Sequence, residues 1–303
     1  MTPYFDSHCH LNDEALVSDL KAVIQSAKKE GVAEILCVGW DYSSSRQAVE
    51  IAERFPGVYA AIGVHPENHE NETPETIEKL RELAKHHKVV AIGEIGLDYY
   101  WKNDPETKTA QKEWFVKQID LANSLGLPVT IHGREASQDL FDIISAHPIE
   151  NGFVLHCYSG SPEMMARFAK LGAYFGFDGP VTFKNAVNPK ECLKACPADR
   201  LLFETDAPYM APVPYRGKRN GPQYIPEIVT KGAEIRQEPL DQLKAQTLKN
   251  FHSLFKRIGG EEVKPQRSSW SKERRTLIFF PRLSKRISLP RMDLPFPKKR
   301  WII

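Results

Sequence analysis

The sequence has little that would direct the chain to a membrane or out of the cell. No hydrophobic run in its 303 residues reaches the roughly 18 residues that a membrane-spanning helix needs. The first residues, MTPYFDSHCH, lack the basic and apolar segments of a signal peptide. We therefore expect a cytoplasmic protein that does not associate with a membrane, and no feature indicates a stable protein partner.

Cysteine and glycine motifs are equally sparse. The five cysteines form no CxxC pair, which excludes a zinc-finger spacing and predicts reduced thiols in a chain long enough to fold without disulfides. No GxGxxG motif follows the first strand-like run, so a dinucleotide-binding fold is disfavoured. The composition, 41% hydrophobic and 26% charged, is that of a globular protein with ample material for a core.

Charge divides the chain into two parts. The formal net charge is +2, but residues 264–303 contain 12 lysines and arginines against 2 acidic residues, so the rest of the chain carries −8. The same segment contains five prolines and keeps neither helical nor strand periodicity for long. We interpret residues 1–260 as one domain and residues 261–303 as a basic, proline-containing extension that is disordered or loosely attached.

The domain alternates short β-branched runs with longer amphipathic segments, a pattern typical of parallel sheets. Strands are expected at residues 4–8, 34–38, 58–64, 89–95, 128–132, 153–156, 173–177 and 201–205. Helices are expected at residues 14–30, 43–54, 73–87, 106–125, 135–146, 162–171, 186–196 and 225–256, the last in two pieces. Eight such units favour an α/β fold of the closed (β/α)8 TIM-barrel type, with an open doubly wound sheet as the alternative.

Side chains that bind metals stand at the C-terminal ends of these runs, where barrel enzymes place their chemistry. In the first run, His8 and His10 are two residues apart, so both imidazoles point to the same face of a strand. The other candidates, at the ends of the fourth, fifth, sixth and eighth runs, are Glu94, His132, His156 and Asp206. Each alone could have a structural role, but six coincidences in separate units favour a joint metal site.

Four imidazoles and two carboxylates are enough to hold two divalent ions, which lie about 3.5–4 Å apart in two-metal hydrolases. Glu94 is the candidate bridge between them, because it stands where a strand-like run meets a glycine-rich loop. Mixed imidazole and carboxylate ligands suit Zn²⁺, Mn²⁺ or Mg²⁺, and the sequence does not decide between these metals.

Further residues near the strand ends could contact a substrate. His65 precedes a proline and could be a metal ligand, a substrate contact or a turn residue. Arg134 could clamp a phosphate with two hydrogen bonds or form a surface ion pair. Tyr99 belongs to the cluster 98–101, whose aromatic rings could stack nucleobases or pack within a loop. Arg216 lies in a basic loop after the eighth run, which suits a phosphate-bearing substrate but could equally be a solvated loop.

At these residues the sequence resembles the TatD family of metal-dependent deoxyribonucleases, within the amidohydrolase-like barrels. The motifs DSHCHL, GVHP, GEIGLDYYW, LPVTIHGRE, LHCYSG and ETDAPYMAPVPYRGKRN follow the family's order and cover nearly all of residues 1–257. The resemblance implies a TIM barrel and the six metal ligands named above. It also implies that His65 contacts the substrate phosphate and that Arg134 helps to hold the substrate.

The chain departs from this family at its C-terminal end. Members normally end soon after the closing helix, whereas this chain continues into the basic extension. The extension could be an arm that raises affinity for nucleic acid by releasing counterions from phosphates. It could instead be unselected sequence appended to a complete domain, which would account for its lack of pattern, and we favour this interpretation.

The leading hypothesis for function is a hydrolase that cleaves phosphodiester bonds in DNA with two divalent ions. We expect Glu94 to bridge the ions, Asp206 to act as the general base, and His65 with Arg134 to neutralise charge on the phosphate. One alternative is hydrolysis of an ester or amide, as in a D-aminoacyl-tRNA deacylase. Another is a non-catalytic nucleic-acid binder that uses its basic extension.

Overall fold

The computed structural model describes residues 2–258, in which parallel strands alternate with helices. The extension expected at 261–303 lies outside the described residues. Within residues 2–258, no helix is both long enough and apolar enough to cross a membrane. The fold of this part is a (β/α)8 barrel, as the sequence predicts.

Eight strands form one sheet in chain order, and every neighbouring pair is parallel. The strands are β1 Tyr4–Cys9, β2 Val32–Val38, β3 Val58–Ile62, β4 Val89–Asp98, β5 Val129–Arg134, β6 Phe153–Leu155, β7 Ala173–Phe177 and β8 Leu201–Phe203. All eight expected strands are confirmed. β4 runs on to Asp98, beyond its expected end at residue 95, because its last residues pair with β5 as far as Arg134.

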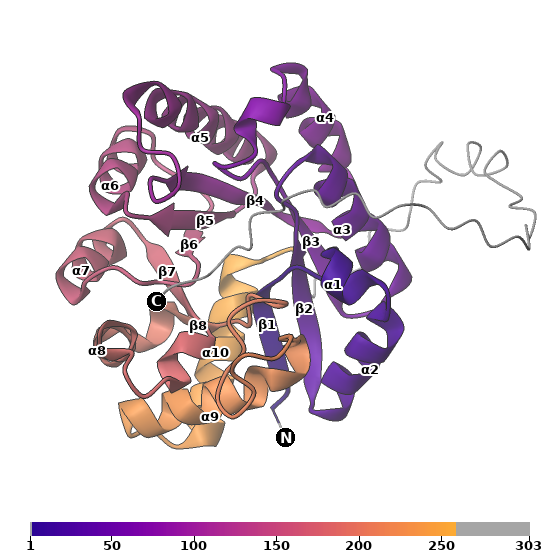
Figure 1. Cartoon of the computed structure of the whole chain (residues 1–303), viewed down its shortest axis with the longest axis vertical. Coiled ribbons are helices and arrows are strands. Elements are labelled where there is room, and N and C mark those ends of the chain that lie inside the picture. The colour runs from indigo at the N-terminus through magenta and orange to yellow at the C-terminus, as the bar shows by residue number, and fades with distance from the viewer. Residues whose placement is uncertain (1, 259–303) are drawn as a thin grey trace, which may run out of the picture. The chain divides into compact units, whose positions relative to one another are not determined.

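Helices connect the strands and surround the sheet (Figure 1). They are α1 Glu14–Val17, α2 Leu20–Lys29, α3 Tyr42–Arg54, α4 Glu75–Leu83, α5 Pro105–Leu125, α6 Ser137–Ala146, α7 Pro162–Lys170, α8 Val187–Ala195, α9 Ile225–Arg236 and α10 Leu240–Leu254, with short 3-10 turns η1 His69–Asn71, η2 Gly179–Thr182, η3 Ala198–Arg200 and η4 Pro222–Tyr224. The segment expected as one helix at 14–30 is divided into α1 and α2 at Ser18 and Asp19.

Apolar side chains of most strands are divided between two hydrophobic clusters, one on each face of the sheet. In β2, Ile35 and Cys37 belong to a large cluster that includes the helices, whereas Leu36 and Val38 belong to a smaller one. The smaller cluster takes one face of most of the strands, including Phe5 of β1. It therefore fills the inside of the barrel, and the large cluster lies between the sheet and its helices.

Helix α10 closes the end of the barrel at which the strands begin. Its residues Phe251, Leu254 and the following Phe255 join the inner cluster and are buried. The Phe251 ring stacks on Phe5, near the start of β1, with ring centroids 4.5 Å apart. Because this end is filled by apolar rings, polar chemistry is confined to the other end, where the strands finish.

The barrel closes between β1 and the segment after β8. Cys9 and Ala207 form a parallel bridge. The backbone N–H of His10 donates to the carbonyl of Ala207 at 2.8 Å, and that of Asp206 donates to the carbonyl of His8 at 3.0 Å. The first and last strands therefore end side by side, which brings three of the expected ligands together.

A buried carboxyl group also supports this closure. Asp6 of β1 accepts hydrogen bonds from the backbone N–H and the hydroxyl of Thr205, at 2.9 and 2.6 Å. Burial raises the pKa of Asp6 to about 8, although the bonds from Thr205 oppose the shift. Asp6 is thus a structural residue that joins β1 to the segment after β8, and it is not one of the expected metal ligands.

Removing the Phe251 ring should destabilise the barrel strongly. Phe251→Ala is expected to lower the free energy of unfolding by about 3–5 kcal/mol, since it leaves a cavity where the ring stacked on Phe5. Val187→Ala is the matched control, because this exposed side chain should change stability by less than about 0.5 kcal/mol. Urea denaturation of both variants measures the difference, and equal stabilities would contradict the assignment of α10 as the barrel floor.

Candidate metal centre

The structure brings together all six side chains that the sequence predicts as metal ligands. They come from β1, β4 and β5 and from the segments that follow β1, β6 and β8, and they are His8, Glu94, His132, His10, His156 and Asp206. Their ligand-type atoms form overlapping groups whose members lie within 4.8 Å of one another, and His65 belongs to the group that contains Glu94 and His132. We call these six residues the candidate centre.

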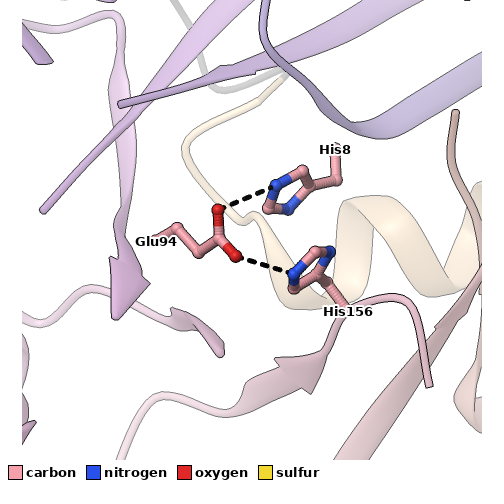
Figure 2. A group of neighbouring side chains, drawn as sticks. All are labelled: His8, Glu94 and His156. Carbon is pink, nitrogen blue, oxygen red and sulfur yellow. Dashed lines mark ion pairs between the residues drawn. The ribbon is translucent and has the colours of Figure 1, made fainter. Parts of the chain in front are cut away.

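Glu94 divides the candidate centre into two halves. Its Oε2 lies 3.5 Å from His8 Nε2 and 3.7 Å from His10 Nε2. Its Oε1 lies 3.0 Å from His132 Nδ1 and 2.7 Å from His156 Nε2. Figure 2 shows the two oxygens directed to different rings, one to His8 and the other to His156. Each oxygen thus belongs to a different pair of imidazoles, the arrangement that a bridging carboxylate needs.

Asp206 completes the half that contains His8 and His10. Its Oδ1 lies 3.4 Å from His10 Nε2 and 3.9 Å from His8 Nε2. The Asp206 backbone has a φ of 53°, in the left-handed region that aspartate tolerates better than most residues. The bond from its N–H to the carbonyl of His8 holds this conformation.

Hydrogen bonds on the far side of three rings leave one nitrogen of each directed at Glu94. His10 Nδ1 lies 3.0 Å from the carbonyl oxygen of Val38, and His8 Nδ1 lies 3.3 Å from Thr130 Oγ1. His132 instead uses Nε2, which is 2.8 Å from Asp98 Oδ2. Outer contacts of this kind select the tautomer and orient imidazoles that bind metals.

The fourth ring, His156, has a buried carboxylate behind it. Its Nδ1 lies 3.5 Å from Glu204 Oε1, a distance of ionic attraction rather than of a good hydrogen bond. Glu204 is held by the backbone N–H of Cys157 at 2.5 Å and the hydroxyl of Ser7 at 3.1 Å. It therefore supplies fixed negative charge behind His156.

Charges within the candidate centre shift the pKa values of Glu94 and His132 in opposite directions. Burial raises the pKa of Glu94, but His156, His65 and His132 together more than offset it and hold that pKa well below the usual range. Burial lowers the pKa of His132, yet hydrogen bonds to Asp98 and Glu94 raise it to about 9. The carboxylates therefore stay ionised at neutral pH, while a proton occupies His132.

The donor set fits divalent cations. Imidazole nitrogens and carboxylate oxygens are the ligands of catalytic Zn²⁺ and related ions. The buried carboxylates of Glu94 and Asp206 face these nitrogens, and their negative charge favours cations over neutral molecules. His8, His10 and Asp206 with one oxygen of Glu94 would hold one ion, and His132 and His156 with the other oxygen would hold a second.

His65 lies beside the candidate centre, with Nε2 3.7 Å from Glu94 Oε1. Its Nδ1 accepts a hydrogen bond from the backbone N–H of Glu67 at 3.1 Å, so the neutral ring carries its hydrogen on Nε2. Burial, followed by the neighbouring His132, lowers the pKa of His65 to about 3. A neutral ring with Nε2–H is a hydrogen-bond donor, which favours a substrate contact over a metal ligand among the roles that the sequence leaves open.

The structure does not bring Tyr99 to the candidate centre. Its side chain is buried in the large outer cluster, and its hydroxyl donates to Asp139 at 2.7 Å. Asp98 turns inward to His132, and since neighbouring side chains of a strand alternate, the next residue points outward. Tyr100 and the 47% exposed Trp101 are the aromatic residues that remain near this strand end.

The two expected arginines lie in different settings. Arg134 stacks over the ring of Tyr100, with its guanidinium carbon 3.7 Å from the centroid, at the end of the strand that carries His132. Arg216 is exposed and stacks over Phe183 at 4.2 Å. Of the two arginines, only Arg134 belongs to a strand that carries a candidate ligand.

Sequence analysis did not single out the two carboxylates behind the imidazoles. Asp98 follows Glu94 by four residues and Glu204 precedes Asp206 by two, spacings that place each near the same face as its neighbour. A glycine also shapes this layer, because a Cβ at Gly96 would collide with the carbonyl oxygen of His132 in the adjacent strand. The spacing of these carboxylates in the sequence was the signal that could have identified them. Which imidazole each carboxylate contacts is visible only in the tertiary structure.

With this geometry established, comparison with known proteins identifies the family. A family model described as TatD related DNase matches residues 5–256. The chain belongs to the TatD family. A TatD-family relative, the metal-dependent hydrolase YabD of Bacillus subtilis, is 44% identical over 253 residues, which cover 83% of this chain and 98% of the relative. YcfH of Escherichia coli, also a metal-dependent hydrolase, is 37% identical over 82% of this chain and 94% of its own length.

A solved TatD-family structure is similar across the same region. The crystal structure of YjjV, a TatD homolog from Escherichia coli, has a TM-score of 0.79 and 31% identity, covering 84% of this chain and 98% of that chain. These relatives are named for metal-dependent hydrolysis, and the six side chains of the candidate centre suit that chemistry. The protein is therefore a metal-dependent hydrolase of the TatD family.

Metal binding by this TatD-family protein should strengthen as pH rises. A ligand imidazole must be unprotonated, and the pKa of His132 is raised to about 9, so protons compete with the ion below that pH. The apparent Kd for Mn²⁺ is expected to fall about tenfold per pH unit between pH 6 and 8 for each proton displaced. Titration calorimetry in buffers of different ionisation enthalpy measures both the affinity and the proton release. A Kd that does not change with pH would contradict the expected displacement.

Asp98 should support metal binding in this TatD-family protein without being a ligand. Asp98→Asn weakens the bond that orients His132 and is expected to lower metal affinity by about 10-fold. Asp139→Asn is the matched control, because Asp139 bonds Tyr99 on the outer side of the barrel. Equal metal affinity of the two variants in calorimetry would show that Asp98 does not position the ring.

Proposed function

We propose that the protein hydrolyses phosphodiester bonds in DNA with two divalent ions held by His8, His10, Glu94, His132, His156 and Asp206. The main support is the position of Glu94, whose two oxygens face two separate pairs of imidazoles. Two-metal sites of this kind are typical of enzymes that cleave phosphate esters. Zn²⁺, Mn²⁺ and Mg²⁺ are the candidate ions, and DNA is the proposed partner as substrate.

When bound, the ions supply a nucleophile from water at neutral pH and neutralise charge on the phosphate. Asp206 is the proposed general base. Burial raises the pKa of Asp206, but His10, with His156 and His8, outweighs it and lowers the pKa below its usual value, so the carboxylate is ionised and able to accept a proton at neutral pH. Its backbone bond to His8 keeps it in place during the reaction.

His65 and Arg134 are the proposed contacts to phosphate oxygens. His65 stays neutral at pH 7 and donates from Nε2 beside Glu94, where charge develops on the phosphate. Arg134 offers a planar guanidinium, oriented by its stack on Tyr100, that can bind two oxygens at once. The carbonyl group of an ester or amide carries no charge, so it would interact less favourably with Arg134 and with a second donor than a phosphate would. For this reason we prefer DNA to an ester or amide as the substrate.

Hydrolysis of end-labelled DNA should require both a metal and the candidate centre. Wild-type protein is expected to cleave single- or double-stranded DNA with Mg²⁺ or Mn²⁺ and to lose cleavage in EDTA. His132→Ala should reduce the rate by about 100-fold or more, since it removes a proposed ligand. His147→Ala, at an exposed position after α6, is the matched control and should keep the wild-type rate.

If the wild-type protein cleaves no DNA although elemental analysis shows that it contains metal, the nuclease proposal is wrong. Ester or amide hydrolysis would then be the better hypothesis, with aminoacyl-tRNA as the next substrate to assay. DNA binding that survives EDTA and weakens with salt, again without cleavage, would instead indicate a nucleic-acid binder that uses its basic extension.

A further inference from the structure

A large aromatic side chain is exposed on the rim of the barrel that carries the candidate centre. Trp101 is 47% exposed and lies in the loop between β4 and α5. Within residues 2–258, the other exposed large hydrophobic residues are Val17, Val187 and Val213. Trp101 is thus the only aromatic residue among these four.

Trp101 belongs to a small ordered stack. Its ring meets that of Tyr100 edge to face, with centroids 4.7 Å apart and planes at 88°. The guanidinium carbon of Arg134 lies 3.7 Å from the centroid of Tyr100 and 5.7 Å from that of Trp101. We call Tyr100, Trp101 and Arg134 the aromatic platform. The contacts among these three side chains orient the indole of Trp101. A ligand ring that stacks on the indole would therefore bind to a side chain that is already positioned.

The aromatic platform is joined to the candidate centre through one carboxylate. Asp98 accepts a hydrogen bond from the backbone N–H of Tyr100 through Oδ1, at 2.9 Å. Its Oδ2 lies 2.8 Å from Nε2 of His132. On the neighbouring strand, Arg134 follows His132 by two residues and pairs with Asp98 in register. The platform and a candidate ligand are therefore positioned by the same short segment of two strands.

We propose that Trp101 forms a stacking subsite for an unpaired nucleobase next to the phosphate that is cleaved, with Tyr100 and Arg134 supporting the ring. This inference rests on the proposed nuclease function and adds a binding residue to it. Every nucleobase has a flat face that stacks on indole, so the subsite binds bases without reading their identity. Arg134 then contacts the backbone phosphate while its guanidinium rests on Tyr100.

Kinetics on a short single-stranded oligonucleotide test the subsite. Trp101→Ala is expected to raise KM about tenfold, the loss typical of one stacked base, with kcat changed less than about twofold. Trp101→Phe keeps an aromatic face and should restore most of the affinity. Val187→Ala, at an exposed residue outside the aromatic platform and the candidate centre, is the matched control and should leave KM unchanged.

A second substrate series separates stacking from general damage to the protein. Oligonucleotides that carry one abasic residue at successive positions are compared between wild type and Trp101→Ala. At the position that the platform contacts, loss of the base should raise KM for the wild type and have no effect on the variant. Equal KM values of wild type and Trp101→Ala on the intact oligonucleotide would overturn the proposal.

Measurement of equilibrium binding tests the stacking subsite even if the proposed nuclease function is wrong. If wild type cleaves no DNA, the Kd of a fluorescently labelled single-stranded oligonucleotide is measured by anisotropy for the same variants. A Kd about tenfold higher for Trp101→Ala than for wild type and Val187→Ala would still support the subsite, whereas equal Kd values would overturn it.

Discussion

The carboxylate of Glu94 stands between two pairs of imidazoles, and the arrangement of the candidate centre depends on this contact. His8 and His10 approach one oxygen, and His132 and His156 approach the other. Buried imidazoles that share a site repel one another when protonated and lose hydration in any state. A fixed negative charge between them offsets both costs. The same charge, placed between two cations, would serve as their bridge.

The barrel makes this contact possible by dividing its interior into two layers. Apolar side chains fill the end at which the strands begin, and α10 covers it with Phe251 and Phe255. The polar layer lies at the opposite end, where parallel strands all present their last residues. Close packing below the site limits movement of the strands, so ligands from distant parts of the chain keep their mutual distances.

Family membership indicates the type of reaction, whereas the residues around the candidate centre bear on the choice of substrate. The relatives are named as metal-dependent hydrolases, which agrees with the side chains of the candidate centre. A metal centre activates water for attack on several kinds of bond, so the choice of substrate depends on the groups around it. In the proposed function those groups are the neutral donor His65 and the aromatic platform, which Asp98 connects to His132. Both suit a nucleotide more than a neutral ester.

The sequence by itself determined the barrel and the set of candidate ligands. Each ligand type stands where an apolar run ends, a local feature that needs no knowledge of the other strands. The pairing of Glu94 oxygens with particular rings, the tautomer of His65 and the outward turn of Tyr99 became visible only in the tertiary structure. The physical reason is that these features depend on contacts and strand register between segments distant in the chain. For example, β4 continues to Asp98 because β5 pairs with it, and that register places Asp98 opposite Arg134.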